Sequence, residues 1–305
     1  MIDYRKIFNS REVRQKLLNI LNFVPDKVML KVQYYLTFGR KLNLKMPERY
    51  TEKVQWYKLY YHDPLMKKCS DKYDVRQYVT EKGLDNILNE CYGVYDSIEE
   101  INLDELPDKF VLKDTMGSGG TSIIFVHDKA TFDFESIKGT LKKWLDTPVN
   151  RKSYGREWGY DGIKHRIIAE KMLLPDSTSD LPDYKFFCFN GKVFCSYFMK
   201  NYSQHPEEGV LGFCDRDFKL LPAYRKDFKP LLEQPEKPEN YELMLEYAEK
   251  LAQDFPHVRV DFYNINGQII FGELTFYNAS GYTEFNPDSF DFTMGKEFVL
   301  PERKL

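Results

Sequence analysis

Residues 258–277, VRVDFYNINGQIIFGELTFY, have the alternating pattern of a β-hairpin and carry two carboxylates, Asp261 and Glu273, among apolar side chains. Because successive side chains of a strand point to opposite faces, Arg259 and Asp261 are expected on one face and Val260 on the other. In the return strand, alternation groups Glu273 with Phe271 and Thr275, away from Ile270, Leu274 and Phe276. If the apolar faces coincide, Arg259, Asp261 and Glu273 share one surface.

Two carboxylates beside an arginine favour a bound cation at this surface. Holding an acidic pair together costs free energy unless something binds between the two groups. Mg²⁺ takes oxygen ligands, typically one or two carboxylates together with the phosphate oxygens of a substrate. The pattern therefore favours Asp261 and Glu273 as metal ligands, and a solvated hairpin face with an ordinary ion pair is the alternative.

The loop between the two strands decides whether the carboxylates meet. With a simple four-residue loop at 264–267, Asp261 would fall opposite Ile270, and Glu273 would lie on the wrong face. An odd loop or a β-bulge restores the match, and Gly267 is best able to adopt the positive φ of a G1 bulge. We therefore expect a bulge at Gly267.

Composition indicates a soluble globular protein. The chain has 305 residues, of which 30% are charged and 42% apolar, and its net charge of −3 argues against a general nucleic-acid binder. This length allows two domains, or one large domain with a mobile lobe. The start of the chain has no apolar signal core, and no apolar run approaches a membrane span. Five scattered cysteines fit reduced thiols, so we expect a cytoplasmic protein.

The first 46 residues carry ten Lys or Arg against three acids, and their apolar residues fit two short amphipathic helices broken at Pro25. We favour a helical layer that packs on the main domain with its basic side in water. The alternative is a patch for an acidic substrate or for the inner face of the cell membrane.

The remaining chain alternates strands with helices. Strands are expected at 84–94, 110–113, 123–126 and 166–172, and as a hairpin around Asn190-Gly191. Helices are expected within 51–82, at 132–144 and at 241–255, and residues 200–238 are expected to be irregular. Strands interrupted by helices, with hairpins, predict an α+β fold.

Two segments suggest nucleotide binding. Lys113 ends an apolar strand, and the loop after it holds Gly117, Gly119 and Gly120, whose backbone can approach phosphate oxygens closely. This is not a Walker A loop, because no lysine follows the glycines, and a flexible β-turn is the alternative. At the end of another strand, Glu170 would offer a carboxylate to a ribose, and the backbone through Leu173 would face an adenine edge.

The order of these features resembles the ATP-grasp superfamily, and more narrowly its TupA-like branch, which is found with capsule and teichuronopeptide assembly. The resemblance spans roughly residues 41–282. It includes DKYDVR at 71–76, YGREW at 154–158, DYKFF at 183–187 and GELTFY at 272–277.

The resemblance implies an ATP-grasp fold whose two α+β lobes grip ATP after an N-terminal helical segment. The implied units are a basic helical segment at 1–65, the N-terminal part of the core at 66–109, a small lobe with a glycine-rich lid at 110–172, and a C-terminal lobe with the metal site at 173–305.

The resemblance also implies roles for individual residues. Lys72 and Lys113 would hold ATP phosphates, Arg259 would stabilise the transferring phosphoryl group or the acyl oxyanion, and Asp261 and Glu273 would bind Mg²⁺, with Mn²⁺ as a substitute. Further nucleotide contacts are implied for the lid residues Gly117, Ser118, Gly119, Gly120 and Thr121, for the hinge residues Glu170, Lys171, Met172 and Leu173, and for Asp183 and Lys185.

One position departs from the family pattern. Many ATP-grasp ligases have an asparagine two residues after the second metal carboxylate, where this chain has Thr275. A hydroxyl is a poorer Mg²⁺ ligand than an amide oxygen, so the number of metal ions stays open. Asn278 is close enough in sequence to substitute.

The activity implied is that of an ATP-dependent carboxylate–amine ligase working through an acyl phosphate. The implied partners are ATP, an amino acid or other amine, and an acidic sugar of a capsular or other surface polysaccharide or its precursor. The loop 151–160 suits such a sugar or, equally, packing of the lid. The alternatives are a glycosyltransferase, for which Asp215-Arg216-Asp217 is the candidate metal motif, and a non-catalytic nucleotide-binding partner.

Overall fold

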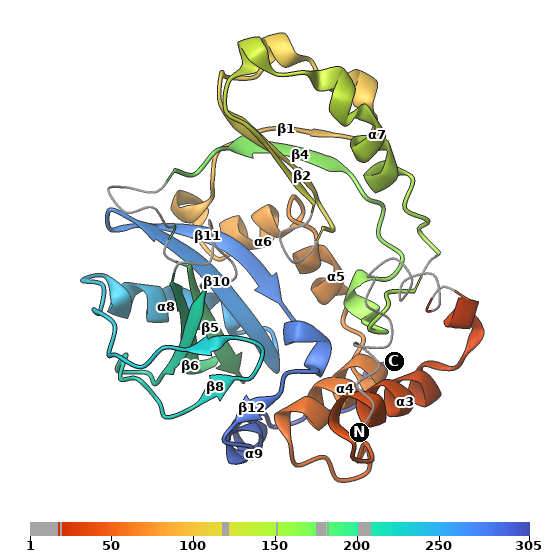
Figure 1. Ribbon diagram of the computed structural model, residues 1–305, viewed down its shortest axis with the longest axis vertical. Helices are drawn as coiled ribbons and strands as arrows, with labels where there is room; N and C mark the ends of the chain where they lie inside the picture. The colour runs from red at the N-terminus through yellow and green to blue at the C-terminus, as the bar shows by residue number, and fades with distance from the viewer. Residues whose placement is uncertain are drawn as a thin grey trace.

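The structure is a computed structural model that describes residues 18, 20–117, 122–150, 152–174, 181, 183–200 and 209–305. Figure 1 shows the strands in two main layers, a smaller one near the top of the long axis and a larger one below it, with helices around them. The strands are β1 Cys91–Tyr95, β2 Phe110–Asp114, β3 Ile123–Val126, β4 Ile167–Lys171, β5 Asp183–Phe189, β6 Lys192–Lys200, β7 Val210–Cys214, β8 Tyr224–Arg225, β9 Lys229–Pro230, β10 His257–Ile265, β11 Gln268–Thr275 and β12 Phe285–Asn286. The helices are α3 Asp26–Phe38, α4 Tyr50–Tyr60, α5 Pro64–Ser70, α6 Val75–Glu81, α7 Phe134–Leu145, α8 Tyr241–Ala252 and α9 Ser289–Glu297.

The smaller layer is a four-stranded antiparallel sheet in the order β1-β4-β2-β3. Its apolar face packs against α7, whose Leu141 and Trp144 are buried with Phe110, Leu112 and Ile167. An Asp133 side chain caps the start of α7 by accepting a hydrogen bond from the Ser136 backbone N–H.

The larger layer is a six-stranded sheet in the order β11-β10-β5-β6-β7-β9, antiparallel except for the β7–β9 pair. Helix α8 covers one face through buried residues at helical spacing, Met244, Leu245, Ala248 and Leu251. The other face carries the charged residues singled out from the sequence. The predicted α+β class is therefore confirmed.

The β10–β11 hairpin pairs Asp261 with Glu273, as the sequence predicted, but the bulge that allows this pairing lies at a different residue. The turn is the two-residue Asn266-Gly267, with φ values of 50° and 79°, which suit a tight hairpin. The bulge lies not at Gly267 but at Gly272, where the register shifts opposite the Asp261–Phe262 step. A Cβ at Gly272 would come within 3.1 Å of the Asp261 carbonyl oxygen, so glycine suits this position.

The displaced bulge also reverses two face assignments. Phe271 pairs with Phe262 on the apolar face, and Ile270 pairs with Tyr263 on the face of Glu273. Both were expected on the opposite faces, because simple parity ignores the extra residue at Gly272.

Two other expectations about elements need correction. Within residues 200–238, which were expected to be irregular, β7 pairs along β6 and extends the large sheet, with β8 and β9 as short additions. Only the end of the expected strand at 84–94 is extended, because residues 85–87 form a 3-10 turn before β1. The strand at 123–126 and the hairpin at Asn190-Gly191 are found as predicted.

The N-terminal helix α3 begins after Pro25 and packs on the main body. Its buried residues, Met29, Leu30, Gln33, Tyr34 and Thr37, lie on one side, and Lys27 and Lys31 are exposed on the other. This arrangement is the helical layer favoured from the sequence. The first of the two expected helices falls mostly outside the described residues. None of the helices in the described part of the chain has the length and apolar character that crossing a membrane requires.

We expect stability to fall with acid because of His257, which lies fully buried between the Tyr50 hydroxyl and the Cys188 carbonyl, 3.0 Å from each. Burial lowers the pKa of this imidazole from 6.5 to about 4. As pH falls, this imidazole is therefore protonated near pH 6.5 in the unfolded chain but stays neutral in the folded protein until about pH 4. The free energy of unfolding should therefore decrease by up to about 3 kcal/mol as pH falls from 6.5 to 4.

Urea unfolding of wild type and His257→Gln at pH 7, 5 and 4 measures this contribution. The glutamine does not titrate, so its acid-dependent loss of unfolding free energy should be smaller. Equal losses in the two proteins would show that His257 does not cause the acid sensitivity.

Candidate active site

The candidate site begins with a row of polar side chains that crosses four neighbouring strands of the large sheet. Strand pairing aligns Glu273 of β11, Asp261 of β10, Lys185 of β5 and Tyr197 of β6. Because aligned residues of paired strands share a face, all four point away from α8. Arg259 lies on the same face of β10, two residues before Asp261.

Arg259 is the centre of this row. Its Nε and Nη2 donate to the two Asp261 carboxylate oxygens at 2.7 and 2.6 Å, and Nη2 also donates to Glu273 Oε1 at 2.8 Å. Its Nη1 donates to the Asn278 amide oxygen at 2.6 Å and to the Tyr197 hydroxyl at 3.3 Å. Arg259 and Asp261 are buried, so this guanidinium is fixed in place by its partners.

Lys185 joins the same cluster from β5. Its Nζ lies 2.7 Å from Asp261 Oδ2 and 2.5 Å from Asp183 Oδ2. Burial opposes its charge, but Asp183 and Asp261 outweigh this effect, so the pKa of Lys185 is raised well above its usual value. Burial also raises the pKa of Asp183, against the pull of Lys185. The cluster therefore keeps its cations charged at neutral pH.

Glu273 is the accessible carboxylate of the cluster. Its side chain is 43% exposed, against 3% for that of Asp261. Desolvation opposes its charge, but Arg259, Lys185 and Lys72 together with the Thr275 hydroxyl lower the pKa of Glu273 to about 2. Within the described residues, hydrogen bonds reach only Oε1, from Arg259 and Thr275. The described residues thus place no hydrogen bond on Oε2.

Lys72 connects the two sheets. It lies in the turn between α5 and α6, its Nζ donates to the Gly117 carbonyl at the start of the glycine-rich loop, and its backbone N–H donates to Thr115 at 3.0 Å. Desolvation lowers the pKa of Lys72, and Glu273 of the large sheet and Lys113 of the small sheet act on it electrostatically. Lys72 therefore lies within electrostatic range of both Glu273 and Lys113.

The turn that carries Lys72 is held to the small sheet by ion pairs. Arg166 Nη2 contacts Asp71 at 2.9 Å and Asp74 at 2.8 Å. Asp71, which is fully buried, also accepts from the backbone N–H groups of Tyr73 and Asp74. The DKYDVR motif thus positions its lysine through its two aspartates.

Lys113 and Glu170 form an ion pair across the small sheet. Lys113 Nζ lies 2.8 Å from Glu170 Oε2, and Arg76 Nη1 lies 3.6 Å from Oε1. Glu170 is therefore held between two cations, and its contact with a ribose stays a prediction. A nucleotide phosphate would find Lys113 already oriented on β2.

The hinge and lid residues have different outcomes. Lys171 is exposed, and its backbone N–H and carbonyl are bonded to the Glu90 carbonyl and the Asn89 side chain, whereas Met172 is buried. The adenine contact of Met172 and Leu173 stays a prediction. Gly117 is described, as noted for Lys72. The lid residues Ser118, Gly119, Gly120 and Thr121 lie outside the described residues.

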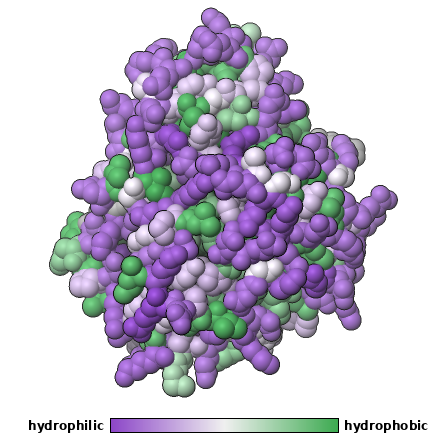
Figure 2. All heavy atoms as spheres, turned by 180° about the vertical axis from the view of Figure 1, so that it is seen from behind, coloured by the Kyte–Doolittle hydropathy of each residue, from purple (hydrophilic) through white to green (hydrophobic). Residues whose placement is uncertain are grey.

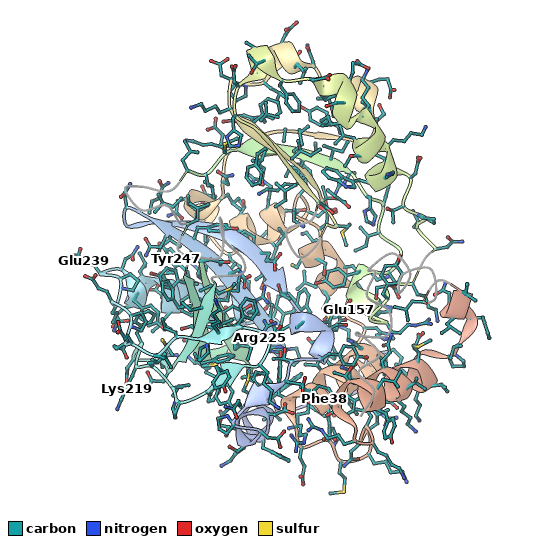
Figure 3. The ribbon with its side chains drawn as sticks, viewed as in Figure 1. Phe38, Glu157, Lys219, Arg225, Glu239 and Tyr247 are labelled. Atoms are coloured by element: carbon teal, nitrogen blue, oxygen red, sulfur yellow. The ribbon has the colours of Figure 1, made fainter. Side chains whose placement is uncertain are left out.

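The loop at 152–160 is used for packing. Lys58 is buried, and its Nζ donates to the Gly155 and Ser280 carbonyls at 2.8 Å each. It also acts electrostatically on the half-buried Glu157 of this loop. Burial lowers the pKa of Lys58 and raises that of Glu157. Arg156 donates to backbone carbonyls of the N-terminal segment and to Asp26. These contacts favour packing over recognition of an acidic sugar, and Figure 3 labels Glu157.

The glycosyltransferase alternative loses its candidate metal motif. Asp215 Oδ1 accepts hydrogen bonds from the backbone N–H groups of Asp217 and Lys219 at 3.0 and 2.8 Å. Such bonds are typical of an aspartate that stabilises a turn. Among the described residues, no group of three His, Cys, Asp or Glu is arranged to hold a metal ion.

The donor set fits a Mg²⁺ ion that arrives with a nucleotide. Asp261 and Glu273 are paired in the strand register and together supply hard oxygen ligands, and the remaining ligands would come from phosphates and water. Asn278 does not add a free ligand, because its amide oxygen accepts from Arg259 and its side chain is buried. Both carboxylates already touch Arg259, so the metal would compete with this arginine.

Sequence reasoning missed Tyr197 and Arg225. The pairing of Tyr197 with Lys185 depends on a bulge in the β5–β6 hairpin, where the register shifts between Phe187 and Cys188. Counting from the Asn190-Gly191 turn alone would place Ser196 opposite Lys185. Arg225 comes from a segment that was expected to be irregular, and no local pattern marks it.

The fold has two α+β layers, and Lys72 lies in a turn that contacts the loop of the smaller one. The small sheet carries a lysine, and the large sheet carries an arginine between two carboxylates. This arrangement is that of an ATP-grasp protein. The model of the TupA-like ATP-grasp family matches residues 52–299, and the chain belongs to this family. The resemblance noted from the sequence is thereby confirmed.

Solved structures with a similar arrangement include D-alanine–D-alanine ligase from Bacillus anthracis complexed with ATP (15% identity, TM-score 0.41, covering 68% of this chain and 54% of that one). N5-carboxyaminoimidazole synthetase from Staphylococcus aureus complexed with ADP has 13% identity and a TM-score of 0.44, with 77% and 53% covered. L-amino acid ligase from Bacillus licheniformis has 12% identity and a TM-score of 0.43, with 85% and 55% covered. The chain thus spans about half the length of these proteins. A comparison with curated proteins finds no significant match.

Proposed function

We propose that the protein is an ATP-dependent carboxylate–amine ligase. The observation that carries the proposal is the contact of Arg259 with both Asp261 and Glu273 on the large sheet. Lys113 lies on the small sheet, and Lys72 donates to the Gly117 carbonyl in the loop that follows it. Cations from one sheet and carboxylates from the other are what a nucleotide triphosphate and its metal require. The identity of the family supports the same reaction.

In this reaction an oxygen of the substrate carboxylate attacks the γ-phosphorus of ATP, and ADP leaves. The amine nitrogen then attacks the acyl carbon, phosphate leaves with the bonding electrons, and the amine releases a proton. Lys72 and Lys113 bind and orient the phosphates, and Arg259 offsets the charge that develops on the transferring group. Mg²⁺, held by Asp261 and Glu273, would neutralise phosphate charge.

We propose a carboxylate of an acidic sugar and an amino acid or other amine as the two substrates, joined during synthesis of a capsular or other surface polysaccharide. The family's association with such assembly motivates this choice. The protein would work in the cytoplasm, at the inner face of the membrane if the basic N-terminal segment meets anionic lipids. Retention of Lys72, Lys113, Arg259, Asp261 and Glu273 disfavours a non-catalytic binding partner.

Phosphate release from ATP and Mg²⁺ tests the proposal. A panel of uronic acids, each combined with each of several amino acids, should contain at least one pair that raises the release rate well above that of ATP alone. The control omits one substrate at a time. A protein that binds ATP tightly but releases no phosphate with any pair would contradict the proposed function.

A further inference from the structure

A second arginine lies near Tyr197, whose hydroxyl accepts a hydrogen bond from Arg259. Arg225 belongs to β8, a two-residue strand paired with β12. The ring of Tyr197 is contacted by both guanidinium groups, at 5.9 Å from its centroid for Arg225 and 5.8 Å for Arg259. Figure 3 labels Arg225, which lies in the lower half of the molecule with the large sheet.

Asp227, the ion-pair partner of Arg225, is much more exposed to solvent than Arg225 itself. Nε and Nη2 donate to the two oxygens of Asp227 at 3.0 and 2.7 Å. The Arg225 side chain is only 11% exposed, whereas that of Asp227 is 55% exposed. A carboxylate so exposed can be hydrated as it leaves, so the pair is of the kind that contributes little to stability.

The charge of Arg225 in its buried position depends on its neighbours. Burial and the nearby Arg259 disfavour this charge, but Asp227 and Tyr197 outweigh them, so the pKa of Arg225 is raised above its usual value. Arg259 is neutralised by the two carboxylates of the site, whereas Asp227 is the only carboxylate among the described residues that pairs with Arg225. An incoming carboxylate presents the same two oxygens as Asp227 and can take its place.

We propose that Arg225 and Tyr197 form a subsite that binds a substrate carboxylate next to Arg259, with Asp227 holding the arginine in place until the substrate displaces it. This subsite rests on the proposed ligase function for its location beside the phosphoryl group. The carboxylate is that of the acidic sugar or the α-carboxylate of an amino acid. The loop at 152–160 does not serve this role, since its charges are used in packing.

Calorimetric titrations test the subsite on the whole chain with saturating Mg²⁺ and a non-hydrolysable ATP analogue. D-Glucuronate is compared with D-glucose, and L-alanine with isopropylamine, so that each pair differs by its carboxylate. Wild type should bind one of the two carboxylates and not its neutral partner. Arg225→Gln should weaken that binding at least tenfold and leave nucleotide binding unchanged, and Arg225→Lys should fall between the two.

Asp227→Asn separates a subsite from a structural ion pair. If Asp227 competes with substrate, its loss should tighten carboxylate binding several-fold, opposite in direction to Arg225→Gln. Arg216→Gln is the matched control, because Arg216 pairs with Glu249 elsewhere on the surface and should not change carboxylate binding. Thermal melting of each variant reports on folding.

The outcomes distinguish the subsite from the ligase. Equal weakening in Arg225→Gln and Asp227→Asn, no effect of Arg225→Gln, or no carboxylate binding by wild type would overturn the subsite. Phosphate release with an unchanged KM in Arg225→Gln would overturn it while the ligase stands. Carboxylate binding that depends on Arg225, without phosphate release from any pair, would support the subsite and contradict the ligase.

Discussion

Replacing Asp261 by Asn should abolish turnover and lower the free energy of unfolding by about 3–5 kcal/mol. The carboxylate is buried and neutralises Arg259 through both of its oxygens and Lys185 through one. An amide leaves two buried cations facing each other, with only Asp183 and Glu273 to offset them. The same substitution removes a carboxylate that would hold Mg²⁺, which is the reason for the expected loss of turnover.

Glu273→Gln is the matched comparison, because this carboxylate contacts the same arginine but is 43% exposed. It should lose turnover to a similar extent, with a change in unfolding free energy within about 1 kcal/mol. Urea unfolding in metal-free buffer measures the difference. If both variants keep wild-type stability, Asp261 does not stabilise the fold through Arg259. If Asp261→Asn still releases phosphate at the wild-type rate, Asp261 has no role in turnover.

Replacing Lys113 by Ala should weaken ATP binding by about 1.5–3 kcal/mol, or roughly 10- to 150-fold in Kd. The lysine is held in place by its ion pair with Glu170 on the neighbouring strand. Its removal takes away a charge-assisted contact to phosphate and also leaves Glu170 facing Arg76 alone, at 3.6 Å. Calorimetry with Mg²⁺–ATP measures the change directly.

Lys138→Ala serves as the control, because Lys138 is an exposed lysine of α7 in the same layer, paired with Glu135 along the helix. It should bind ATP like wild type. A folded Lys113→Ala protein with unchanged ATP affinity would remove Lys113 from the nucleotide site.

Figure 2 shows that the face opposite to the view of Figure 1 is mostly hydrophilic, with apolar residues in small separate patches. This agrees with the balance of charged and apolar residues in the sequence. Composition thus indicated a globular protein with a largely polar surface, but it carried no information about the position of the site.

The sequence determined those features that depend on local patterns. Alternation in residues 258–277 placed Arg259 with Asp261, the dipeptide Asn190-Gly191 placed a hairpin, and helical spacing placed α8. Such features follow from the period of a strand or helix and from the few residues that accept a positive φ. The order of the motifs was enough to identify the family.

Only the tertiary structure decided the register and the remote contacts. The bulge at Gly272 and the shifted pairing at Phe187 each move a strand by one residue, which changes the face of every side chain beyond that point. The location of a bulge depends on how the partner strand packs, so local sequence does not specify it. Arg225 lies over the ring of Tyr197, and Lys58 bonds to the Gly155 carbonyl, for the same reason. Contacts between distant segments are set by the packing of the whole sheet and its covering loops rather than by any pattern along the chain.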